Sequence, residues 1–194
     1  MKRRTFIQAM ISVGTSSLLA ENSRAEHNKV SLRFLRPPAA LAEDEFLSRC
    51  IRCGKCGEVC PNRCIQYFDL ENGLSSMDTP YIIPRDKGCI LCMKCGEACP
   101  SGAIPPVARE MHTILDNVHM GKAVVNEELC LSFQGKTCGV CYRACPLQDV
   151  AIRVGRLEQP HVLKDCVGCG LCERACIQIP QAIRIIPDYE RAKT

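Results

Sequence analysis

The sequence contains no tryptophan, few other aromatic residues and only four histidines, and these shortages already exclude several kinds of protein. Aromatic residues make up 5% of the 194 positions, so a conventional hydrophobic core would be thin for a chain of this length. The histidines are too few and too scattered for a set of histidine-containing zinc sites. They are His27, His112, His119 and His161. Something other than aromatic side chains must therefore fill the interior.

The short motifs that accompany catalysis are also missing. The chain has no serine or cysteine nucleophile elbow, no glycine-rich phosphate-binding loop and no flavin or nicotinamide fingerprint. The longest apolar stretch, residues 9–20, contains serines and a glycine and falls short of the roughly 20 residues of a membrane-spanning helix. We expect a protein without independent catalysis, whose mature part is soluble or peripheral to a membrane.

Cysteine, by contrast, is abundant: there are 17, and 16 of them fall into four runs that end in Cys-x3-Cys. Runs one, two and four share the spacing C-x2-C-x2-C-x3-C, while run three has seven residues between its first two cysteines. In chain order the runs are Cys50, Cys53, Cys56 and Cys60; Cys89, Cys92, Cys95 and Cys99; Cys130, Cys138, Cys141 and Cys145; and Cys166, Cys169, Cys172 and Cys176. A proline follows the first three runs, and Ile177 follows the fourth.

This spacing is that of bacterial ferredoxins, in which three thiolates of a run bind one 4Fe-4S cluster and the fourth reaches the neighbouring cluster. Four runs therefore predict four 4Fe-4S clusters, with all sixteen cysteines as iron ligands. Zinc is disfavoured, because zinc sites combine two cysteine pairs or a pair with histidines. A disulfide framework is disfavoured by the odd cysteine total and by the near identity of the runs.

The residues between the cysteines have predicted roles as well. Glycines within the runs allow the chain to curl around a cluster, since glycine tolerates positive φ and lets backbone amides approach the cluster sulfurs. The seven residues between Cys130 and Cys138 must form a loop that bulges away from its cluster. The seventeenth cysteine, Cys64, aligns with Ala103 of the second repeat and is predicted to be a small buried filler.

Because the last cysteine of each run serves a neighbouring cluster, the four runs must pair, and two pairings are possible. Tandem pairing joins run one with run two and run three with run four, whereas nested pairing joins one with four and two with three. The short interval between Cys145 and Cys166 slightly favours tandem pairing, and nested pairing stays open. Under tandem pairing one cluster is held by Cys50, Cys53, Cys56 and Cys99, and the next by Cys89, Cys92, Cys95 and Cys60.

We expect an α+β fold of the bacterial ferredoxin type, built from two two-cluster units with short strands and helices. The predicted segments are a signal segment (1–25), a lead-in with a short helix (26–49), a first two-cluster unit (50–120) and a second one (121–194). Helices are expected at 39–49 and 110–120, and strands at 81–83, 103–104, 122–125, 150–154, 161–163 and 182–186.

The N-terminus has the layout of an export signal, with a basic start followed by an apolar stretch. Arg3 and Arg4, followed by Thr5, Phe6 and Ile7, match the twin-arginine form of such signals. Clusters are inserted in the cytoplasm, so only a route that carries folded protein would deliver the finished product. The sequence thus predicts a periplasmic protein, peripherally associated with the inner membrane.

The charge balance argues against nucleic acid as a partner. The formal net charge of +4 falls to +1 without residues 1–25, since 21 basic and 20 acidic residues remain. Each oxidised cluster with its four thiolates adds about two negative charges. The cluster-loaded protein is therefore expected to be acidic and to bind no nucleic acid.

Beside the cysteine spacing, four segments stand out. They are the twin arginines, the segment from Arg36 to Leu41, Thr79-Pro80-Tyr81, and the long third run from Cys130 to Pro146. Together they resemble the NapG/MauM family of ferredoxin-type proteins over nearly the whole chain. The resemblance implies a periplasmic four-cluster carrier that works with a membrane-bound, NapH-like iron-sulfur quinol dehydrogenase. It implies an acceptor that is a periplasmic reductase, such as nitrate reductase, or a cytochrome, or else a role in methylamine utilisation.

The leading hypothesis is an electron-transfer component of an oxidoreductase system, with clusters forming a path from a quinol-oxidising membrane partner to a soluble acceptor. The competing hypothesis is a maturation or assembly factor for a periplasmic redox enzyme, of the methylamine-utilisation type, that supplies electrons or clusters to an apo-enzyme. A third hypothesis is the iron-sulfur subunit of a molybdenum oxidoreductase, which would copurify with a large catalytic subunit in fixed ratio.

Overall fold

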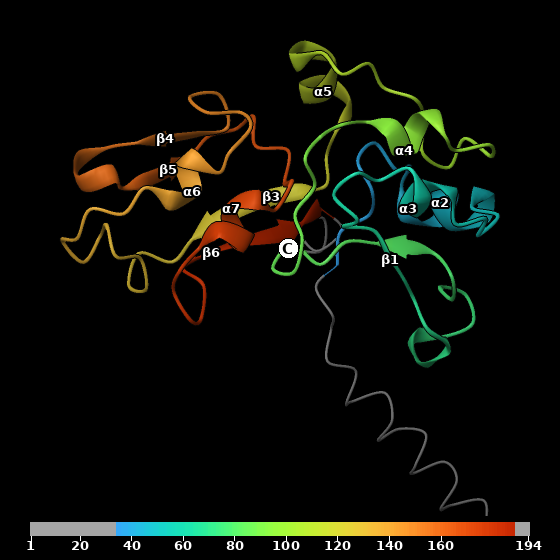
Figure 1. Cartoon of the computed structure of the whole chain (residues 1–194), viewed down its shortest axis with the longest axis horizontal. Helices are drawn as coiled ribbons and strands as arrows, with labels where there is room; N and C mark the ends of the chain where they lie inside the picture. The colour runs from blue at the N-terminus through green and yellow to red at the C-terminus, as the bar shows by residue number, and fades with distance from the viewer. Residues whose placement is uncertain (1–33, 189–194) are drawn as a thin grey trace, which may run out of the picture. The chain divides into compact units, whose positions relative to one another are not determined.

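Short helices and two-stranded ribbons make up the described part of the protein, residues 34–188 of a computed structural model (Figure 1). The predicted signal segment lies outside this range. The helices are α2 (Glu43–Arg49), α3 (Lys55–Glu58), α4 (Lys94–Glu97), α5 (Met111–Asn117), α6 (Val140–Arg143) and α7 (Leu171–Ala175), with 3-10 turns η1 (Leu70–Asn72) and η2 (Arg156–Glu158). The strands are β1 (Gln66–Tyr67), β2 (Pro80–Tyr81), β3 (Gly121–Val125), β4 (Ile152–Val154), β5 (Pro160–Val162) and β6 (Ile183–Pro187). None of the helices in this range combines the length and apolar character that crossing a bilayer requires.

The strands pair antiparallel as β1 with β2, β3 with β6 and β4 with β5. The pair β3–β6 is the longest, and its register runs from Gly121 opposite Pro187 to Val125 opposite Ile183. Runs three and four both lie between these two strands in the sequence. The β3–β6 pair therefore closes one long loop that contains eight of the predicted ligands.

Each run enters its helix through residues with left-handed backbone. Gly54, Gly139 and Gly170 precede α3, α6 and α7 with φ of 75°, 57° and 84°, as the predicted role of glycine requires. Run two differs, because Met93 precedes α4 with φ 62° and Leu91 has φ 54°. This backbone costs a non-glycine residue ~1–2 kcal/mol. Both side chains are buried, and burying each contributes about 1.5–3 kcal/mol, which offsets the strain.

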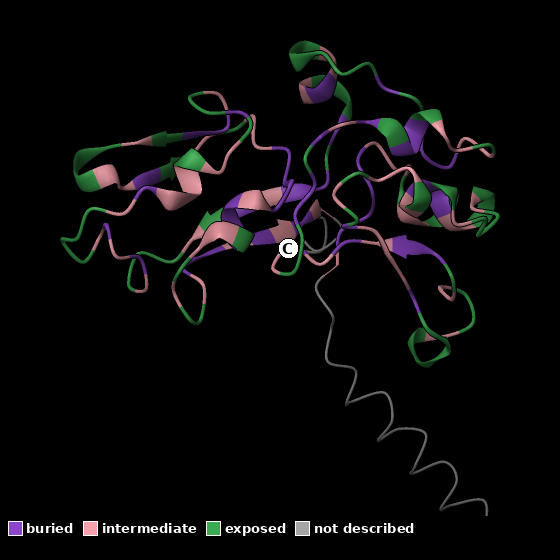
Figure 2. Cartoon of the chain, viewed as in Figure 1, coloured by how far each residue is buried: buried purple, intermediate pink, exposed green. Residues whose placement is uncertain are grey.

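Apolar side chains from both halves of the described chain share one core. Figure 2 colours all buried residues purple, those of this core among them. Its members include Leu35, Ile82, Val118, Ile152 and Ile185, together with Cys89, Cys169 and Cys172. A smaller core around Phe46 contains Cys56, Cys95, Ala103 and Ile104. Predicted ligands therefore lie inside both cores, in a chain that has few aromatic residues to fill them.

Most predicted elements form close to their expected positions. The helices expected at 39–49 and 110–120 are α2 and α5, and the strands expected at 122–125, 150–154, 161–163 and 182–186 are β3, β4, β5 and β6. The strand expected at 103–104 is wrong. Ala103 and Ile104 lie in a bend, and the prolines that follow, Pro105 and Pro106, cannot donate hydrogen bonds to a ladder. The unpredicted β1 pairs instead with β2, which takes the place of the strand expected at 81–83.

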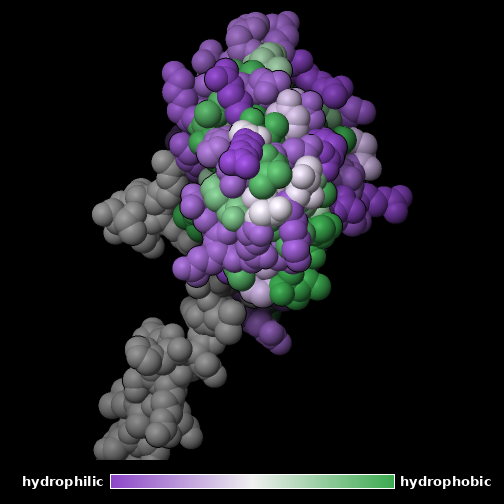
Figure 3. Space-filling model, turned by 90° about the vertical axis from the view of Figure 1, so that its left-hand side faces the viewer, coloured by the Kyte–Doolittle hydropathy of each residue, from purple (hydrophilic) through white to green (hydrophobic). Residues whose placement is uncertain are grey.

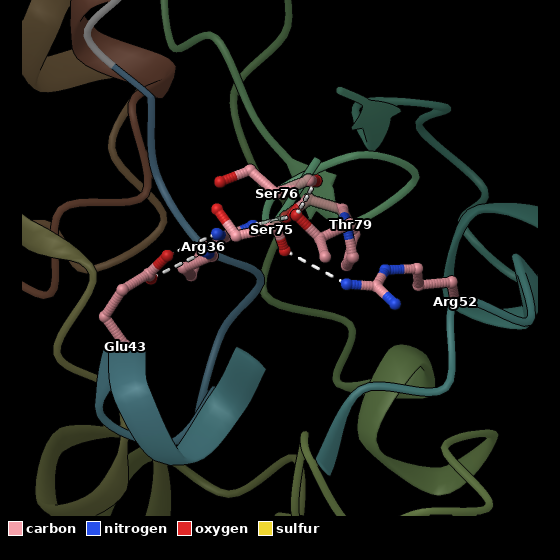
Figure 4. A network of polar contacts seen from close by, with 7 residues as sticks. Arg36, Glu43, Arg52, Ser75, Ser76 and Thr79 are labelled. Carbon is pink, nitrogen blue, oxygen red and sulfur yellow. Dashed lines mark hydrogen bonds and ion pairs between the residues drawn. The ribbon is translucent and has the colours of Figure 1, made fainter. Parts of the chain in front are cut away.

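A buried arginine connects the lead-in to the first half of the described chain (Figure 4). The guanidinium of Arg36 donates to Oε2 of Glu43 at 2.8 Å. It also donates to Oγ1 of Thr79 at 3.0 Å and to the carbonyl of Pro80 at 2.8 Å. Its carbon Cζ lies 4.7 Å from the ring centroid of Phe46, within cation–π range. The side chain of Arg36 thus connects the segment before α2 both to α2 and to β2.

Candidate iron-sulfur cluster sites

The predicted ligands gather in sets of four, and three pockets each contain one set. We call them site I (Cys50, Cys53, Cys56 and Cys99), site III (Cys130, Cys138, Cys141 and Cys176) and site IV (Cys145, Cys166, Cys169 and Cys172). The four remaining predicted ligands, Cys60, Cys89, Cys92 and Cys95, are called site II. Each pocket takes three thiols from one run and the fourth from another.

Two cysteines of site II are in contact with the seventeenth cysteine, Cys64. The sulfur of Cys64 lies 3.6 Å from the sulfur of Cys60 and shares a hydrogen bond with the thiol of Cys89. Burial and, next in size, the nearby Cys92 raise the pKa of Cys95 to about 12. Cys64 therefore connects Cys60 of run one with Cys89 of run two.

The helices that follow the left-handed turns explain why the fourth thiol comes from a different run. Each of these helices contains the third cysteine of its run, and they pack in pairs, α3 against α4 and α6 against α7. The last cysteine follows its helix and reaches the pocket of the paired run, as Cys99, Cys145 and Cys176 do. The seven-residue loop of run three leaves Cys130 and Cys138 lining the same pocket. The pockets combine run one with run two, and run three with run four.

The lining of the pockets suits an iron-sulfur cluster in its chemistry. Within residues 34–188, no three His, Cys, Asp or Glu side chains come close enough together to bind a single metal ion. The three pockets have similar empty volumes of about 350 to 380 Å³, including space open to solvent. Apart from its thiols, site IV is lined by small and apolar residues, among them Ala123, Leu147, Ile152, Val162 and Ile185. Soft thiolate ligands select such clusters, and apolar walls exclude water from them.

The β3–β6 ribbon contributes hydrogen-bond donors to two of the sites. The backbone N–H of Ala123 in β3 donates to the sulfur of Cys166 at 3.5 Å. The backbone N–H of Ala182, directly before β6, donates to the sulfur of Cys176 at 3.3 Å. Such N–H···S hydrogen bonds favour the thiolate and tune the potential of a cluster bound to it.

Burial raises the pKa of several thiols above the ordinary value of 9.0. The pKa is raised to about 12 at Cys169 and to about 11 at Cys141, with removal from water as the largest cause. Neighbouring cysteines of the same site, such as Cys166 beside Cys169, add to the shift because a second negative charge would be close. At neutral pH these thiols keep their protons until a metal replaces them.

Tyr67 is a residue of site I that the sequence analysis missed. Its hydroxyl donates to the carbonyl of Gly54 at 2.5 Å and accepts from the N–H of Gly57 at 3.0 Å. The same hydroxyl lies 3.9 Å from the sulfur of Cys56. It occupies the place that a Cβ at position 57 would need. The glycine after Cys56 was the available signal, because a side chain there would displace the tyrosine.

Cys64 is buried, as predicted for a filler, but it also touches two cysteines of site II. Hydrogen bonding from Cys89 is the largest cause that lowers the pKa of Cys64 to about 7. The same contact, with Cys64 as the neighbouring charge, helps to raise the pKa of Cys89 well above its ordinary value. Cys64 is therefore a direct neighbour of predicted ligands, which its alignment with an alanine did not indicate.

Two segments, residues 49–103 and 88–150, match the family Fer4_7, the 4Fe-4S dicluster domain. The first match covers runs one and two, which share site I. The second match spans runs two and three, although the pockets combine run three with run four. The sequence matches therefore join run two with run one and also with run three. The pockets join run one with run two, and run three with run four.

Known proteins resemble the chain over most of its length. It is 43% identical to the ferredoxin-type protein NapG of Escherichia coli (strain K12), in an alignment that covers 79% of this chain and 70% of the relative. It is 37% identical to the methylamine utilization ferredoxin-type protein MauM of Methylorubrum extorquens, with 82% of this chain and 76% of the relative covered. The MauM of Methylophilus methylotrophus is 34% identical, with 96% of this chain and 86% of the relative covered. These matches support bound 4Fe-4S clusters and an electron-transfer role.

Proposed function

Because the chain belongs to the NapG/MauM family of ferredoxin-type proteins, we propose that it is a periplasmic electron carrier with four 4Fe-4S clusters in sites I to IV. The observation that supports this most directly is the grouping of four thiols in each of three pockets. The contacts of Cys60 and Cys89 through Cys64 support site II as the fourth. Tandem pairing of the runs follows from this assignment, with two ferredoxin-like units of two clusters each.

The protein's own residues would hold, shield and tune these groups. A 4Fe-4S cluster supplies reversible uptake of a single electron at a potential that its surroundings set. The sixteen thiolates bind the iron, the apolar walls described for site IV exclude water, and the N–H groups of Ala123 and Ala182 stabilise thiolate charge. A side chain that would act as acid, base or nucleophile is not needed for this role.

We place the electron donor in the membrane and the acceptor in the periplasm. The donor is a NapH-like iron-sulfur quinol dehydrogenase, where a quinol loses two electrons and two protons. The carrier accepts the electrons one at a time, and the protons are released from the donor's quinol site to the solvent. The acceptor is a periplasmic reductase, as in a nitrate-reductase chain, or a cytochrome. Peripheral association with the inner membrane would bring the carrier to its donor.

The cluster content is tested on anaerobically purified protein. Four clusters require about 16 iron and about 16 acid-labile sulfide per chain, with electron paramagnetic resonance signals of reduced 4Fe-4S clusters at low temperature. The matched variant Cys95→Ala should lose about four iron, while Arg63→Ala, outside the sites, should lose none. Zinc in place of iron, or no sulfide after reconstitution, would refute the proposal.

The carrier role is tested separately by stopped-flow mixing of the reduced protein with a candidate periplasmic reductase. Fast reoxidation supports the carrier. A fully loaded protein that is not reoxidised by any candidate, yet binds an apo-enzyme and restores its activity, would favour the maturation factor instead.

Export is tested by changing the twin arginines. Arg3→Lys together with Arg4→Lys should retain the protein in the cytoplasm, because the twin-arginine route recognises the pair itself. Fractionation followed by iron determination reads the result. Unchanged periplasmic protein would contradict the assigned route.

A further inference from the structure

A direct hydrogen bond joins a predicted ligand of site II to a predicted ligand of site IV. The backbone N–H of Cys89 donates to the carbonyl of Cys169 at 2.7 Å. Cys89 belongs to run two and Cys169 to run four, so neither pairing of the runs in the sequence brings these two residues together. Both side chains are buried in the shared core.

Glycine makes this close approach possible. A Cβ at Gly88 would lie 2.6 Å from the nitrogen of Leu171 and 2.8 Å from the carbonyl carbon of Gly170. A Cβ at Gly170 would in turn lie 2.7 Å from Cβ of Pro84. Two backbones are thus in contact here without side chains between them. We call this contact, between residues 84–89 and 168–171, the junction.

Hydrogen bonds of Arg85 stabilise the junction on one side. Nη1 of Arg85 donates to the carbonyl of Glu173 at 3.0 Å and to the carbonyl of Cys176 at 2.8 Å, both in or beside α7. On the other side, the Nδ2 amide of Asn62 donates to the carbonyl of Gly88 at 2.6 Å. A cation at the C-terminal end of a helix is favoured by the helix dipole as well.

The other neighbouring sites meet through different cysteines. Sites I and II are close where α3, which contains Cys56, packs against α4, which contains Cys95, and both cysteines lie in the smaller core. Sites III and IV are close where α6 packs against α7, with Cys141 near Cys172. These contacts join the sites within each pair of runs, and the junction joins the two pairs.

From these contacts we propose that electrons cross the protein in the order site I, site II, site IV, site III, with the junction at Cys89 and Cys169 as the step between the two pairs. This inference rests on the proposed function and gives it a path. Each step moves one electron, which oxidises the donating site and reduces the next. No bond forms or breaks and no proton is needed. The path differs from the order of the runs in the sequence at its second half.

Exposure agrees with sites I and III as the two ends. In site I, Cys53 is exposed and its neighbour Ile51 is 64% exposed. Sites I and III each contain a single buried thiol, Cys56 and Cys130. Sites II and IV each contain two, Cys89 with Cys95 and Cys169 with Cys172. Figure 3 views the side that carries α6, β4 and β5, where apolar side chains (green) interrupt a mostly polar surface.

The order is tested by the magnetic interactions between reduced clusters, which report proximity without any partner or turnover. Electron paramagnetic resonance is recorded on the wild type, on Cys95→Ala to empty site II and on Cys53→Ala to empty site I, each with its iron content. We expect Cys95→Ala to leave site I magnetically isolated while sites III and IV still interact. We expect Cys53→Ala to leave three interacting clusters. The order is overturned if Cys53→Ala abolishes the interaction of site II with sites III and IV. It is also overturned if site I still interacts with another cluster in Cys95→Ala.

The junction itself is tested by adding one methyl group. Gly88→Ala should weaken the interaction between sites II and IV and leave the interactions within each pair unchanged. The control is Gly155→Ala, which lies outside the junction with a φ of -101° and whose added Cβ would meet only the side chain of His161 within 3.5 Å. If Gly88→Ala loses iron, Arg85→Ala, which leaves every ligand and glycine in place, is measured instead. An unchanged interaction in both variants overturns the role of the junction, whereas a wild type with little iron refutes the proposed function and not the order.

Discussion

The hydroxyl of Tyr67 accepts a hydrogen bond from the backbone N–H of Gly57 at 3.0 Å and donates one to the carbonyl of Gly54 at 2.5 Å. A side chain outside the cysteine runs therefore fixes the turn of run one that carries Cys56. The aromatic ring comes from β1, so the small β1–β2 ribbon has a role in shaping site I.

Tyr67→Phe should destabilise site I. The change removes both hydrogen bonds of the hydroxyl, while the Gly57 N–H still donates to the Gly54 carbonyl at 3.0 Å, so the cost should be about 0.5–1.5 kcal/mol for each bond lost. We expect faster chelator-driven loss of about one quarter of the iron, measured by absorbance. The control is Tyr142→Phe, whose hydroxyl bonds Asp149 on the exposed surface and whose removal should change little. Equal iron loss in both variants would contradict the role of Tyr67.

The buried ion pair of Arg36 should contribute much more to the free energy of unfolding than an exposed ion pair does. Arg36→Ala removes the ion pair with Glu43, the hydrogen bonds to Thr79 and Pro80, and the packing on Phe46, and should cost about 3–5 kcal/mol of unfolding free energy. The exposed pair of Arg49 with Glu45 serves as control, and Arg49→Ala should change stability by less than ~1 kcal/mol. Denaturant unfolding of the loaded protein measures both. Similar losses in the two variants would be inconsistent with the network.

Cys64→Ala should keep the full iron content, because Cys64 is a neighbour and not a ligand in the assigned set. It should shift the midpoint potential of one cluster to lower values, since a thiol dipole next to the sulfur of Cys60 is lost. A redox titration followed by electron paramagnetic resonance reads the shift. Cys60→Ala is the comparison, and it should lose iron. Loss of iron from Cys64→Ala would make Cys64 a ligand and revise site II.

Iron uptake by the apoprotein should rise with pH. Burial raises the pKa of Cys169 to about 12 and that of Cys141 to about 11, so at pH 7 to 9 these thiols are protonated and must release protons to bind metal. Proton release on binding means that affinity increases as pH rises through this window, by up to about tenfold per pH unit for each proton. Anaerobic reconstitution at several pH values, with the released protons counted, measures the slope. A flat profile from pH 7 to 9 would contradict this linkage.

Removing the clusters should unfold most of the chain. Predicted ligands lie inside both cores, so a chain without clusters would leave the apolar side chains around them poorly packed, in a sequence with only 5% aromatic residues. Circular dichroism before and after chelation under reducing conditions should show loss of most secondary structure. A chelated protein with its native spectrum would show that the cores are stable without metal.

The sequence by itself determined the chemistry and the family. Ligand spacing is a local property, so Cys50-x2-Cys53-x2-Cys56 predicted a cluster-binding turn without knowledge of the fold. The resemblance to the NapG/MauM family is confirmed by the similar proteins. Short strands such as β3 and β6 were also predictable, because their β-prone residues follow or precede the runs directly.

Tertiary structure decided which residues meet. Nothing local to run one indicates that Tyr67 completes its turn, or that Cys64 touches Cys89, since both contacts form when the chain folds back on itself. The left-handed backbone at Leu91 and Met93 depends on burial of their side chains in a core drawn from both halves. The approach of Cys89 to Cys169 joins residues 80 positions apart and depends on two backbones that contact each other at glycines. Spacing along the chain fixes local ligand geometry, but the neighbours of a site are set by long-range packing, which spacing does not encode.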